Sequence, residues 1–260
     1  MNSQPIYLER KAPVARLILN RPDRLNALND AIWQAIPGLL VEVAADPAIK
    51  VLMVSGVDDS AFAAGADIAE FAQIMATGTA DAYARRMAFA TRALAEFPKP
   101  TIAVIAGPCV GGGCSLALCC DFRFAAEGAR FGVTPAKLGI AYPLEDTRRL
   151  IAAVGISAAR DLLMTGRVVT AGAALSLGLI DRCWPAGNLW GEARDYAATL
   201  AAGSQYSIRA TKAIFGEILA GAVDETDTSR ALFAKAFDGE DLKEGAAAFL
   251  DKRKPRFTFS

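Results

Sequence analysis

The chain alternates between short apolar runs and longer stretches of helical periodicity. Five runs rich in β-branched or apolar residues are bounded by Gly, Pro or Asp and are typical of strands: residues 14–20, 50–55, 101–106, 122–125 and 179–183. Residues 29–45 and 79–97 have helical periodicity, and Asn29 and Thr79 stand where helix caps are expected. This alternation predicts an α/β fold in which helical crossovers join parallel strands.

The last third of the chain has a different pattern. From Ser157 onward the sequence reads as almost wholly helical, which predicts a helical appendage to the α/β part. A chain of 260 residues buries roughly 70 to 75% of its unfolded surface, so its core needs no metal or disulfide for support.

Charge and hydropathy exclude several classes of partner. The 28 basic residues balance 28 acidic ones, so we expect no field that gathers nucleic acid or an anionic membrane. No apolar stretch reaches the roughly 20 residues of a membrane helix, and the amino terminus lacks the pattern of a signal peptide. We therefore expect a cytoplasmic protein.

The sequence contains no histidine. A Ser-His-Asp triad, a Cys-His pair and an HExxH zinc site are therefore excluded, and proton transfer must use Asp, Glu, Tyr, Lys, Cys or water. The five cysteines lack paired CxxC spacing, and an odd number is a poor disulfide framework. We interpret them as small buried apolar residues and predict no metal site.

Two glycine-containing turns carry the strongest chemical signal. Gly111, Gly112 and Gly113 follow the apolar run TIAVIA, and Gly65 lies in FAAGADI after the second predicted strand. Neither GxGxxG nor GxxxxGK[ST] is present, which argues against a nucleotide site. The glycines alone are equally explained by close packing of a helix on a strand. Two such turns near helix amino termini, however, predict two backbone amides that hold one carbonyl oxygen as an oxyanion hole.

Six segments in this order resemble the crotonase, or enoyl-CoA hydratase/isomerase, superfamily: NRPDRLNALN, FAAGADI, GGGCSLALCCD, RFGVTPAKLG, MTGRVVTAGAALSLGLID and EGAAAFLDKRKPRF. The resemblance implies an α/β crotonase-like spiral of ββα units over residues 1–200 and a helical trimerisation region over residues 201–260. It also implies a homotrimer or dimer of trimers that acts on acyl-CoA thioesters, with coenzyme A as part of the substrate and no further cofactor.

The same resemblance assigns site residues. The amides of Ala66 and Gly112 would hold the thioester oxygen. Coenzyme A would lie along the following residues: Arg24, Leu25, Ala27, Ala64, Asp67 and Ile68, with Phe249 and Lys252 reaching it from the carboxyl-terminal helix of the same or a neighbouring subunit. Asp67 is also suited to capping a helix, and Lys252 to being a solvated charge on a basic tail.

Both acids that serve hydration in family members are absent. Ser115 and Pro135 stand where the hydratases have glutamates. Serine is a weak base without a partner, and proline transfers no proton. Glu145 or Asp146, in YPLEDTRRL, are possible substitutes, although acidic residues in a first helical turn are also explained by the helix dipole.

A decarboxylase needs the hole and no strong base, because the departing carboxylate supplies the electrons of the enolate. The segment TPAKLGIAY, with Tyr142 at its end, resembles the methylmalonyl-CoA decarboxylase branch, whose tyrosine contacts the substrate carboxylate. That branch has a histidine at Ala66 and a glutamate at Ser115, so the match is incomplete. Tyr142 is also explained as a rim or core aromatic.

The sequence thus predicts an enzyme that stabilises a thioester enolate, with decarboxylation of a short malonyl-type CoA as the leading reaction. An enoyl-CoA hydratase or isomerase with a displaced carboxylate is the first alternative. A noncatalytic acyl-CoA-binding trimer is the second. We expect residues 71–97 and 138–150 to line the acyl pocket.

Overall fold

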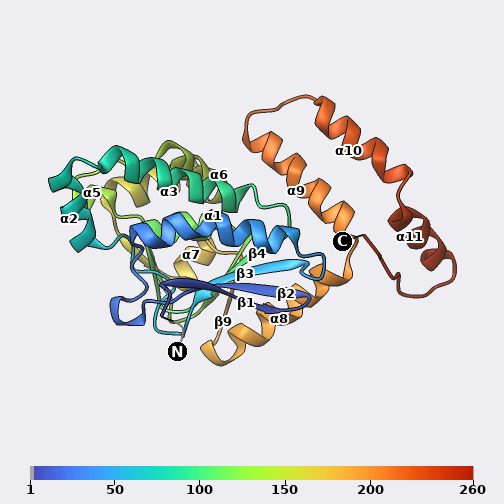
Figure 1. Ribbon diagram of the computed structural model, residues 1–260, viewed down its shortest axis with the longest axis horizontal. Coiled ribbons are helices and arrows are strands. Elements are labelled where there is room, and N and C mark those ends of the chain that lie inside the picture. The colour runs from blue at the N-terminus through green and yellow to red at the C-terminus, as the bar shows by residue number, and fades with distance from the viewer. Residues whose placement is uncertain (1–2, 260) are drawn as a thin grey trace.

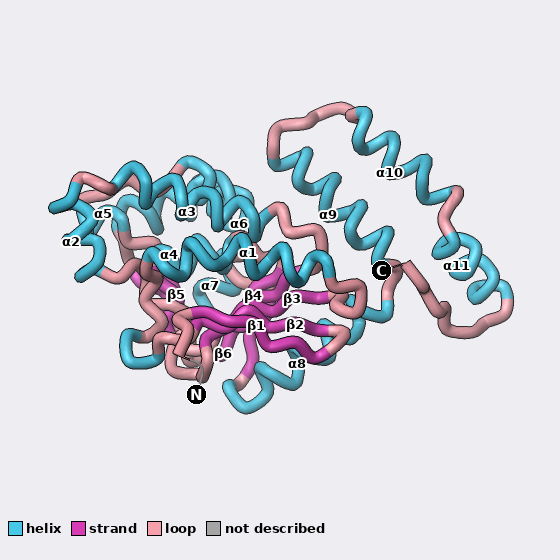
Figure 2. Tube along the Cα trace, in the orientation of Figure 1, coloured by secondary structure: helices cyan, strands magenta, loops and turns pink. Residues whose placement is uncertain are grey.

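The computed structural model describes residues 3–259 and is built on a mixed sheet of six strands. The strand order is β1 (Ile6–Lys11), β2 (Val14–Leu19), β3 (Val51–Gly56), β4 (Thr101–Ile105), β6 (Phe122–Ala126) and β9 (Arg182–Trp184). β1 and β2 are antiparallel, and every later neighbouring pair is parallel. The predicted α/β fold with parallel strands and helical crossovers is confirmed (Figure 2).

A second, smaller sheet consists of β5 (Pro108–Val110), β7 (Arg130–Gly132) and β8 (Val168–Thr170). β5 pairs parallel with β7, and β7 pairs antiparallel with β8. None of these strands was predicted, because three residues are too few to show a periodicity of two. β5 matters for the site because it leads directly into the glycine turn.

Helices cover both faces of the large sheet (Figure 1). Their bounds are η1 (Pro22–Arg24), α1 (Asp30–Ala45), α2 (Ile68–Thr77), α3 (Ala80–Ala95), α4 (Gly112–Leu118), α5 (Pro135–Leu138), α6 (Leu144–Thr165), α7 (Ala171–Leu177), α8 (Ala186–Ala202), α9 (Gln205–Leu219), α10 (Asp227–Phe237) and α11 (Glu240–Leu250). Alternate residues of β3 face opposite ways. Leu52 and Val54 pack in the core that includes α1 and α3, whereas Val51 and Met53 pack with Leu189 of α8.

Three local predictions need correction. Asn29 caps α1 by accepting from the amide of Ile32 at 3.2 Å, but the side chain of Thr79 makes no capping bond to α3. The strand predicted at 179–183 begins only at Arg182, because Gly178 ends α7 in a left-handed turn and the next residues complete it. The almost wholly helical pattern predicted from Ser157 is interrupted by β8 and β9, and α6 begins earlier than that residue.

The last three helices form an arm, α9–α11, that extends away from the sheet (Figure 1). α8 ends at Ala202 and α9 begins at Gln205, so a division between residues 200 and 201 falls in the last turn of α8. Lys212 of α9 joins the arm to the core through a 2.7 Å ion pair with Asp121. Large apolar side chains on the arm are exposed in the single chain: Phe215, Phe233, Phe237, Phe249 and Leu250.

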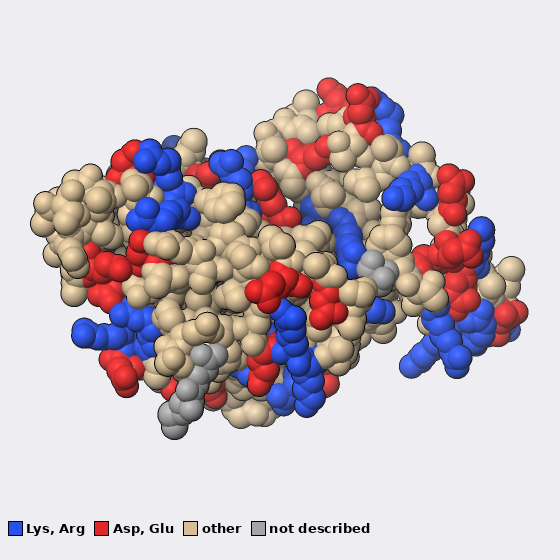
Figure 3. Space-filling view, viewed as in Figure 1, with Lys and Arg blue, Asp and Glu red and all other residues tan. Residues whose placement is uncertain are grey.

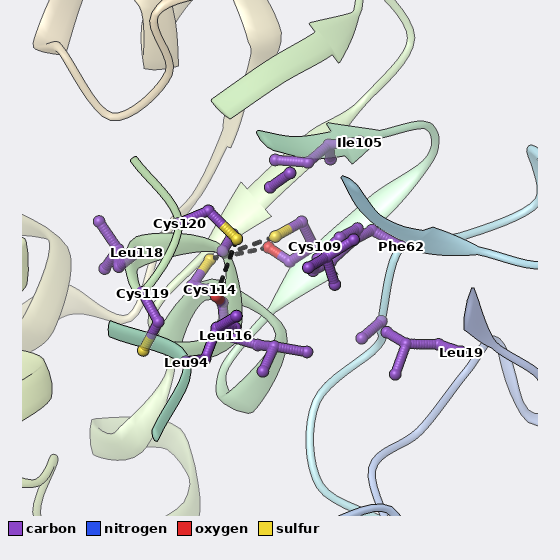
Figure 4. Close-up of a cluster of buried hydrophobic side chains, with 14 of the residues drawn as sticks. Leu19, Phe62, Leu94, Ile105, Cys109, Cys114, Leu116, Leu118, Cys119 and Cys120 are labelled. Carbon is purple, nitrogen blue, oxygen red and sulfur yellow. Dashed lines mark hydrogen bonds between the residues drawn. The ribbon is translucent and has the colours of Figure 1, made fainter. Parts of the chain in front are cut away.

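Four of the five cysteines belong to one cluster of buried side chains (Figure 4). Cys109, Cys114, Cys119 and Cys120 are buried free thiols, as expected, and Cys183 is partly buried. The thiol of Cys114 donates to the carbonyl oxygen of Cys109 at 2.9 Å, which ties α4 to β5. These thiols serve packing, since they lie among apolar side chains of the core.

Across residues 3–259, no helix is both long and apolar enough to pass through a bilayer. The same residues contain no cluster of three or more His, Cys, Asp or Glu side chains suited to a metal ion. On the face shown in Figure 3, acidic and basic side chains are interspersed.

Candidate active site

The two glycine-containing turns lie against each other. The amide of Val110 donates to the carbonyl oxygen of Ala63 at 2.9 Å, and Ala63 and Cys109 form a parallel bridge. A Cβ on Gly113 would stand 2.5 Å from that same carbonyl oxygen, so no larger residue fits. Gly111 has a φ of +52°, a left-handed conformation that favours glycine. The glycine run is therefore required by close backbone approach between the turns.

Ala66 and Gly112 both line one cavity. Ala66 lies two residues before α2, and Gly112 is the first residue of α4. Within residues 3–259 neither amide donates to a backbone carbonyl. The first amides of a helix carry partial positive charge. Two residues of the cavity wall, from two different turns, thus have amides that make no backbone hydrogen bond among the described residues.

The cavity has a volume of about 610 Å³ and a mostly apolar wall. Its lining draws on both segments that were expected to form the acyl pocket. From α1, α2 and α3 come Trp33, Phe71, Ile74, Met75, Tyr83, Ala84 and Met87, and from the opposite side come Leu138, Ile140, Ala141, Tyr142, Pro143 and Asp146. A space of this size and character suits an acyl group next to a reactive carbonyl.

Polar groups gather at one end of the cavity. The hydroxyls of Ser115 and Tyr142 lie 2.8 Å apart. Asp146 is only 2% exposed, and its Oδ1 accepts from Nη1 of Arg149 at 3.0 Å. Burial raises the pKa of Asp146 above its ordinary value, while hydrogen bonding from Ser115 and the charge of Arg149 oppose the rise. Burial also raises the pKa of Tyr142, and the nearby Asp146 adds to that rise.

Among the two acidic residues considered for proton transfer, only one faces the cavity. Glu145 is not part of the cavity wall, and its carboxylate pairs with Arg148 at 3.0 Å on the outside of α6. Asp146, and not Glu145, is the carboxyl group at the cavity. Helical spacing could have found it, because Leu150 is buried and a residue four positions earlier lies on the same helix face. Pro135 also lines the cavity and is buried.

The segments expected to bind coenzyme A from the first half of the chain are brought together. The amide of Ala64 donates to the carbonyl oxygen of Leu25 at 2.9 Å. Arg24 and Leu25 are exposed, and Ala27 is partly buried. Buried Asn26 holds the loop in place, because its amide group donates to Ala61 at 2.8 Å. The exposed Ile68 begins α2 beside these residues.

Asp67 is engaged within the protein. It caps α2 by accepting from the amide of Ala69 at 3.2 Å, as its position suggested. Its other oxygen accepts from Arg21 at 2.7 Å. The hydrogen bond from Arg21 lowers the pKa of Asp67 below its ordinary value. Asp67 therefore holds the loop of Arg21 against the turn of Ala66.

Phe249 and Lys252 are not brought to this cavity within one chain. Phe249 lies in the last turn of α11 and Lys252 follows that helix, and α11 lies in the arm, far from α2 and α5 (Figure 1). Phe249 is 84% exposed. A contact between these residues and a ligand in the cavity therefore requires another copy of the chain.

The family of the protein follows from comparison with known proteins. The enoyl-CoA hydratase/isomerase family model matches residues 9–259. The chain belongs to this family. It is 39% identical to the Probable enoyl-CoA hydratase of Mycobacterium bovis over 259 residues, which is 99% of each chain. It is 36% identical over 263 residues to the crotonyl-CoA hydratase of Syntrophomonas wolfei, again covering 99% of each.

Solved structures show the same fold. A family member from Hyphomonas neptunium is 52% identical with a TM-score of 0.95, and the match covers 98% of both chains. An enoyl-CoA hydratase/carnithine racemase from Magnetospirillum magneticum is 35% identical with a TM-score of 0.94, covering 100% of this chain and 97% of the other. The crotonase fold predicted from the six segments is thus confirmed. The curated relatives cited here are named hydratases, not decarboxylases.

Proposed function

We propose that the protein decarboxylates a short malonyl-type CoA thioester by stabilising the enolate in an oxyanion hole formed by Ala66 and Gly112. The hydrogen-bonded pair Ser115 and Tyr142, 2.8 Å apart on the wall that also holds the two unused amides, carries this proposal. Ser115 stands at one of the two positions where hydration would require a glutamate, and the Tyr142 hydroxyl is bonded to it.

The proposed reaction breaks one carbon–carbon bond. The Tyr142 hydroxyl donates to the substrate carboxylate and holds it away from the plane of the thioester. Carbon dioxide leaves, and the electrons of the broken bond move onto the thioester oxygen, where the two amides stabilise the charge. A proton from water then reaches the α-carbon and completes the acyl-CoA product. The apolar wall of the cavity favours loss of the charged carboxylate as neutral carbon dioxide.

Carbon dioxide release from methylmalonyl-CoA tests this reaction directly. We expect turnover by the wild-type protein and a loss of roughly tenfold or more in Tyr142→Phe, because the variant lacks the hydroxyl that positions the carboxylate. Malonyl-CoA and ethylmalonyl-CoA complete the panel. Absence of carbon dioxide release from every member would refute decarboxylation.

The buried Asp146 favours a second candidate function, hydration or double-bond isomerisation of an enoyl-CoA. Asp146 lines the cavity, and burial raises its pKa above the ordinary value, which is the direction that suits a carboxyl group that accepts and returns a proton. The hydratase names of the relatives support the same chemistry. Loss of crotonyl-CoA absorbance, abolished in Asp146→Asn and retained in Glu145→Gln, would favour this candidate.

We also propose that the chain works as a homotrimer or a dimer of trimers. Exposed Phe233, Phe237 and Phe249 on the arm support association with further copies, since each would otherwise remain in water. In such an assembly Phe249 and Lys252 of one copy would reach coenzyme A bound to its neighbour. Tight binding of CoA thioesters by the assembly, without chemistry on any of them, would instead identify a noncatalytic acyl-CoA-binding protein.

A further inference from the structure

The wall that α1, α2 and α3 give to the cavity is apolar except at two side chains. Tyr83 of α3 is 5% exposed, and its hydroxyl oxygen accepts from Nε1 of Trp33 on α1 at 3.0 Å. Both residues line the cavity. Within residues 3–259, the other side chains from these three helices on the wall are aliphatic, aromatic or thioether groups. The mechanism proposed above uses neither of the two polar groups.

Trp33 connects this hydroxyl group to the candidate oxyanion hole. Its Cζ2 atom lies 3.6 Å from the point where a Cβ on Gly112 would stand. Cζ2 and Nε1 lie on the same edge of the indole ring, so this edge extends from Gly112 to the Tyr83 oxygen. Phe71 contacts Tyr83 edge to face, with ring centroids 5.9 Å apart, and holds its ring in place. The Tyr83 hydroxyl is therefore one indole ring away from the position proposed for the thioester.

The Tyr83 hydroxyl keeps a proton that no part of the protein accepts. The indole N–H only donates, so the Tyr83 oxygen accepts from Trp33 and its own proton remains to be donated. Across residues 3–259, no side-chain or backbone atom lies where it could accept that proton in a hydrogen bond. Buried hydroxyl groups are rarely left without a partner. A ligand in the cavity can supply the missing acceptor.

Charged groups next to Tyr83 determine which kind of acceptor suits it. Glu70 accepts from the backbone amide of Asp30 at 2.7 Å, and the Asp30 carboxylate accepts from Nε of Arg86 at 2.6 Å. Arg86 follows Tyr83 by three residues, so this group of two negative charges and one positive charge lies beside the tyrosine. Burial, together with the two acidic charges, raises the pKa of Tyr83 and keeps its proton in place. An anionic ligand group would be repelled here, whereas a neutral oxygen would not.

We propose that Tyr83 is a specificity-determining residue that donates a hydrogen bond to a neutral oxygen, of a ketone or a hydroxyl group, on the acyl chain of a bound CoA thioester. The indole of Trp33 fixes the hydroxyl oxygen and leaves its proton for the ligand. The inference goes beyond the proposed function and rests on it only in placing a CoA thioester in the cavity. It holds whichever reaction then takes place at the thioester.

Pairs of unreactive CoA thioethers isolate this contact. In each pair a ketone oxygen is replaced by a methyl group: 3-oxobutyl-CoA and 3-methylbutyl-CoA, 4-oxopentyl-CoA and 4-methylpentyl-CoA, and 5-oxohexyl-CoA and 5-methylhexyl-CoA. Titration calorimetry gives the Kd of each ligand. Without a donor, an apolar wall disfavours the ketone, because its oxygen loses hydration. For at least one pair we therefore expect the affinity for the ketone, relative to its methyl partner, to fall about tenfold in Tyr83→Phe.

Three variants assign the effect to one hydroxyl group. Tyr83→Phe keeps the ring that packs on Phe71, so its Kd for the methyl ligands should stay within about twofold of the wild type. Tyr142→Phe removes the other tyrosine hydroxyl at the cavity and should leave the relative affinity for the ketone unchanged. Tyr196→Phe, whose ring packs on Phe122 and is not part of the cavity wall, should behave as the wild type.

Two results would overturn the inference. One is a Tyr83→Phe protein with the wild-type relative affinity for every ketone, since the hydroxyl would then serve only Trp33. The other is a carboxylate ligand, in which an oxygen replaces the terminal methyl group of the responding ketone, that loses as much affinity in Tyr83→Phe as the ketone does. The acceptor would then not be restricted to neutral oxygens. Because no thioether can react, these results are independent of carbon dioxide release, and this contact and decarboxylation succeed or fail separately.

Discussion

The backbone nitrogen of Ala66 lies 3.9 Å from the point where a Cβ on Gly112 would stand. Replacement of Gly112 by proline removes one of the two amide donors, and proline is otherwise tolerated at the first position of a helix. We expect kcat on the substrate to fall about 100- to 1000-fold, as for loss of one oxyanion-hole donor. Steady-state turnover of the CoA thioester measures the loss.

Gly112→Ala is the matched comparison for that variant, because it keeps the amide and adds only a methyl group. The new Cβ would lie 3.2 Å from Cδ1 of Leu28, a flexible tip that can shift. Its activity should therefore lie well above that of Gly112→Pro. Gly128→Ala, where nothing lies within 4 Å of the added Cβ, should match the wild type. Equal activity in the proline and alanine variants would argue against a catalytic amide.

Asn26 should be costly to replace. It is fully buried, its amide group donates to Ala61 at 2.8 Å, and its oxygen accepts from the amide of Arg21 at 2.8 Å. Asn26→Ala leaves both partners without a hydrogen bond, so the free energy of unfolding should fall by about 2 to 4 kcal/mol. Urea denaturation measures this free energy of unfolding. As a control, Asn188→Ala at an exposed position should change the free energy of unfolding by no more than about 0.5 kcal/mol.

Lys99 predicts a rise of stability with pH. Burial lowers its pKa to about 8 from the ordinary 10.5, and Arg209 adds to the effect. Between these two values Lys99 binds more protons in the unfolded chain than in the folded one, so its contribution to the free energy of unfolding rises with pH. We expect this contribution to be about 1 to 3 kcal/mol over that window, measured as the difference between the wild type and Lys99→Met, because the buried thiols act in the opposite sense. Lys99→Met should lack it, and exposed Lys11→Met should retain it; identical pH profiles for all three proteins would contradict the prediction.

The buried cysteines should resist thiol reagents in the native protein. Burial raises the pKa of Cys119 to about 12, and those of Cys109 and Cys120 also lie above their ordinary values. Since the thiolate is the reactive form, a raised pKa keeps these groups unreactive at neutral pH. Burial also raises the pKa of Cys183, but this thiol is only partly buried, so it should be labelled before the others, and Cys183→Ser should abolish that signal. Rapid labelling of several thiols without denaturant would disprove the packing described for α4.

The arm provides a test of assembly. Phe233 and Phe237 contact each other edge to face, with ring centroids 5.3 Å apart, and both are exposed in the single chain. Replacement of both by aspartate should yield a smaller species in sedimentation velocity, because charges cannot be buried at an apolar contact. Asp224→Asn, in the exposed turn before α10, is the control. A wild-type protein that sediments as a monomer would contradict the proposed assembly.

The sequence predicted the central strands well because β3 and β4 are mostly apolar and buried over their whole length, as is typical of strands covered on both faces. It also predicted that FAAGADI and the glycine run would meet. The three-residue strands β5, β7 and β8 were missed, since their existence depends on pairing partners far along the chain. Cap residues show the same limit: Asn29 and Thr79 occupy equivalent positions, and only Asn29 makes the bond.

Which of two adjacent acidic residues lies at the cavity depends on its position around helix α6. Glu145 and Asp146 are adjacent in sequence, yet one pairs with Arg148 outside and the other is buried at the cavity. Composition cannot separate two neighbouring carboxylates, whereas the buried Leu150 four residues later can. The placement of Phe249 and Lys252 relative to bound coenzyme A lies beyond any single chain.

The bond from the Val110 amide to the Ala63 carbonyl oxygen joins the loops that bear the two candidate donors. Folding therefore fixes the relative position of both donors before any substrate binds. The free-energy cost of ordering the two donors is therefore part of folding. It does not reduce the binding free energy of the charged intermediate. Catalysis by this chain would begin from a rigid, preorganised scaffold.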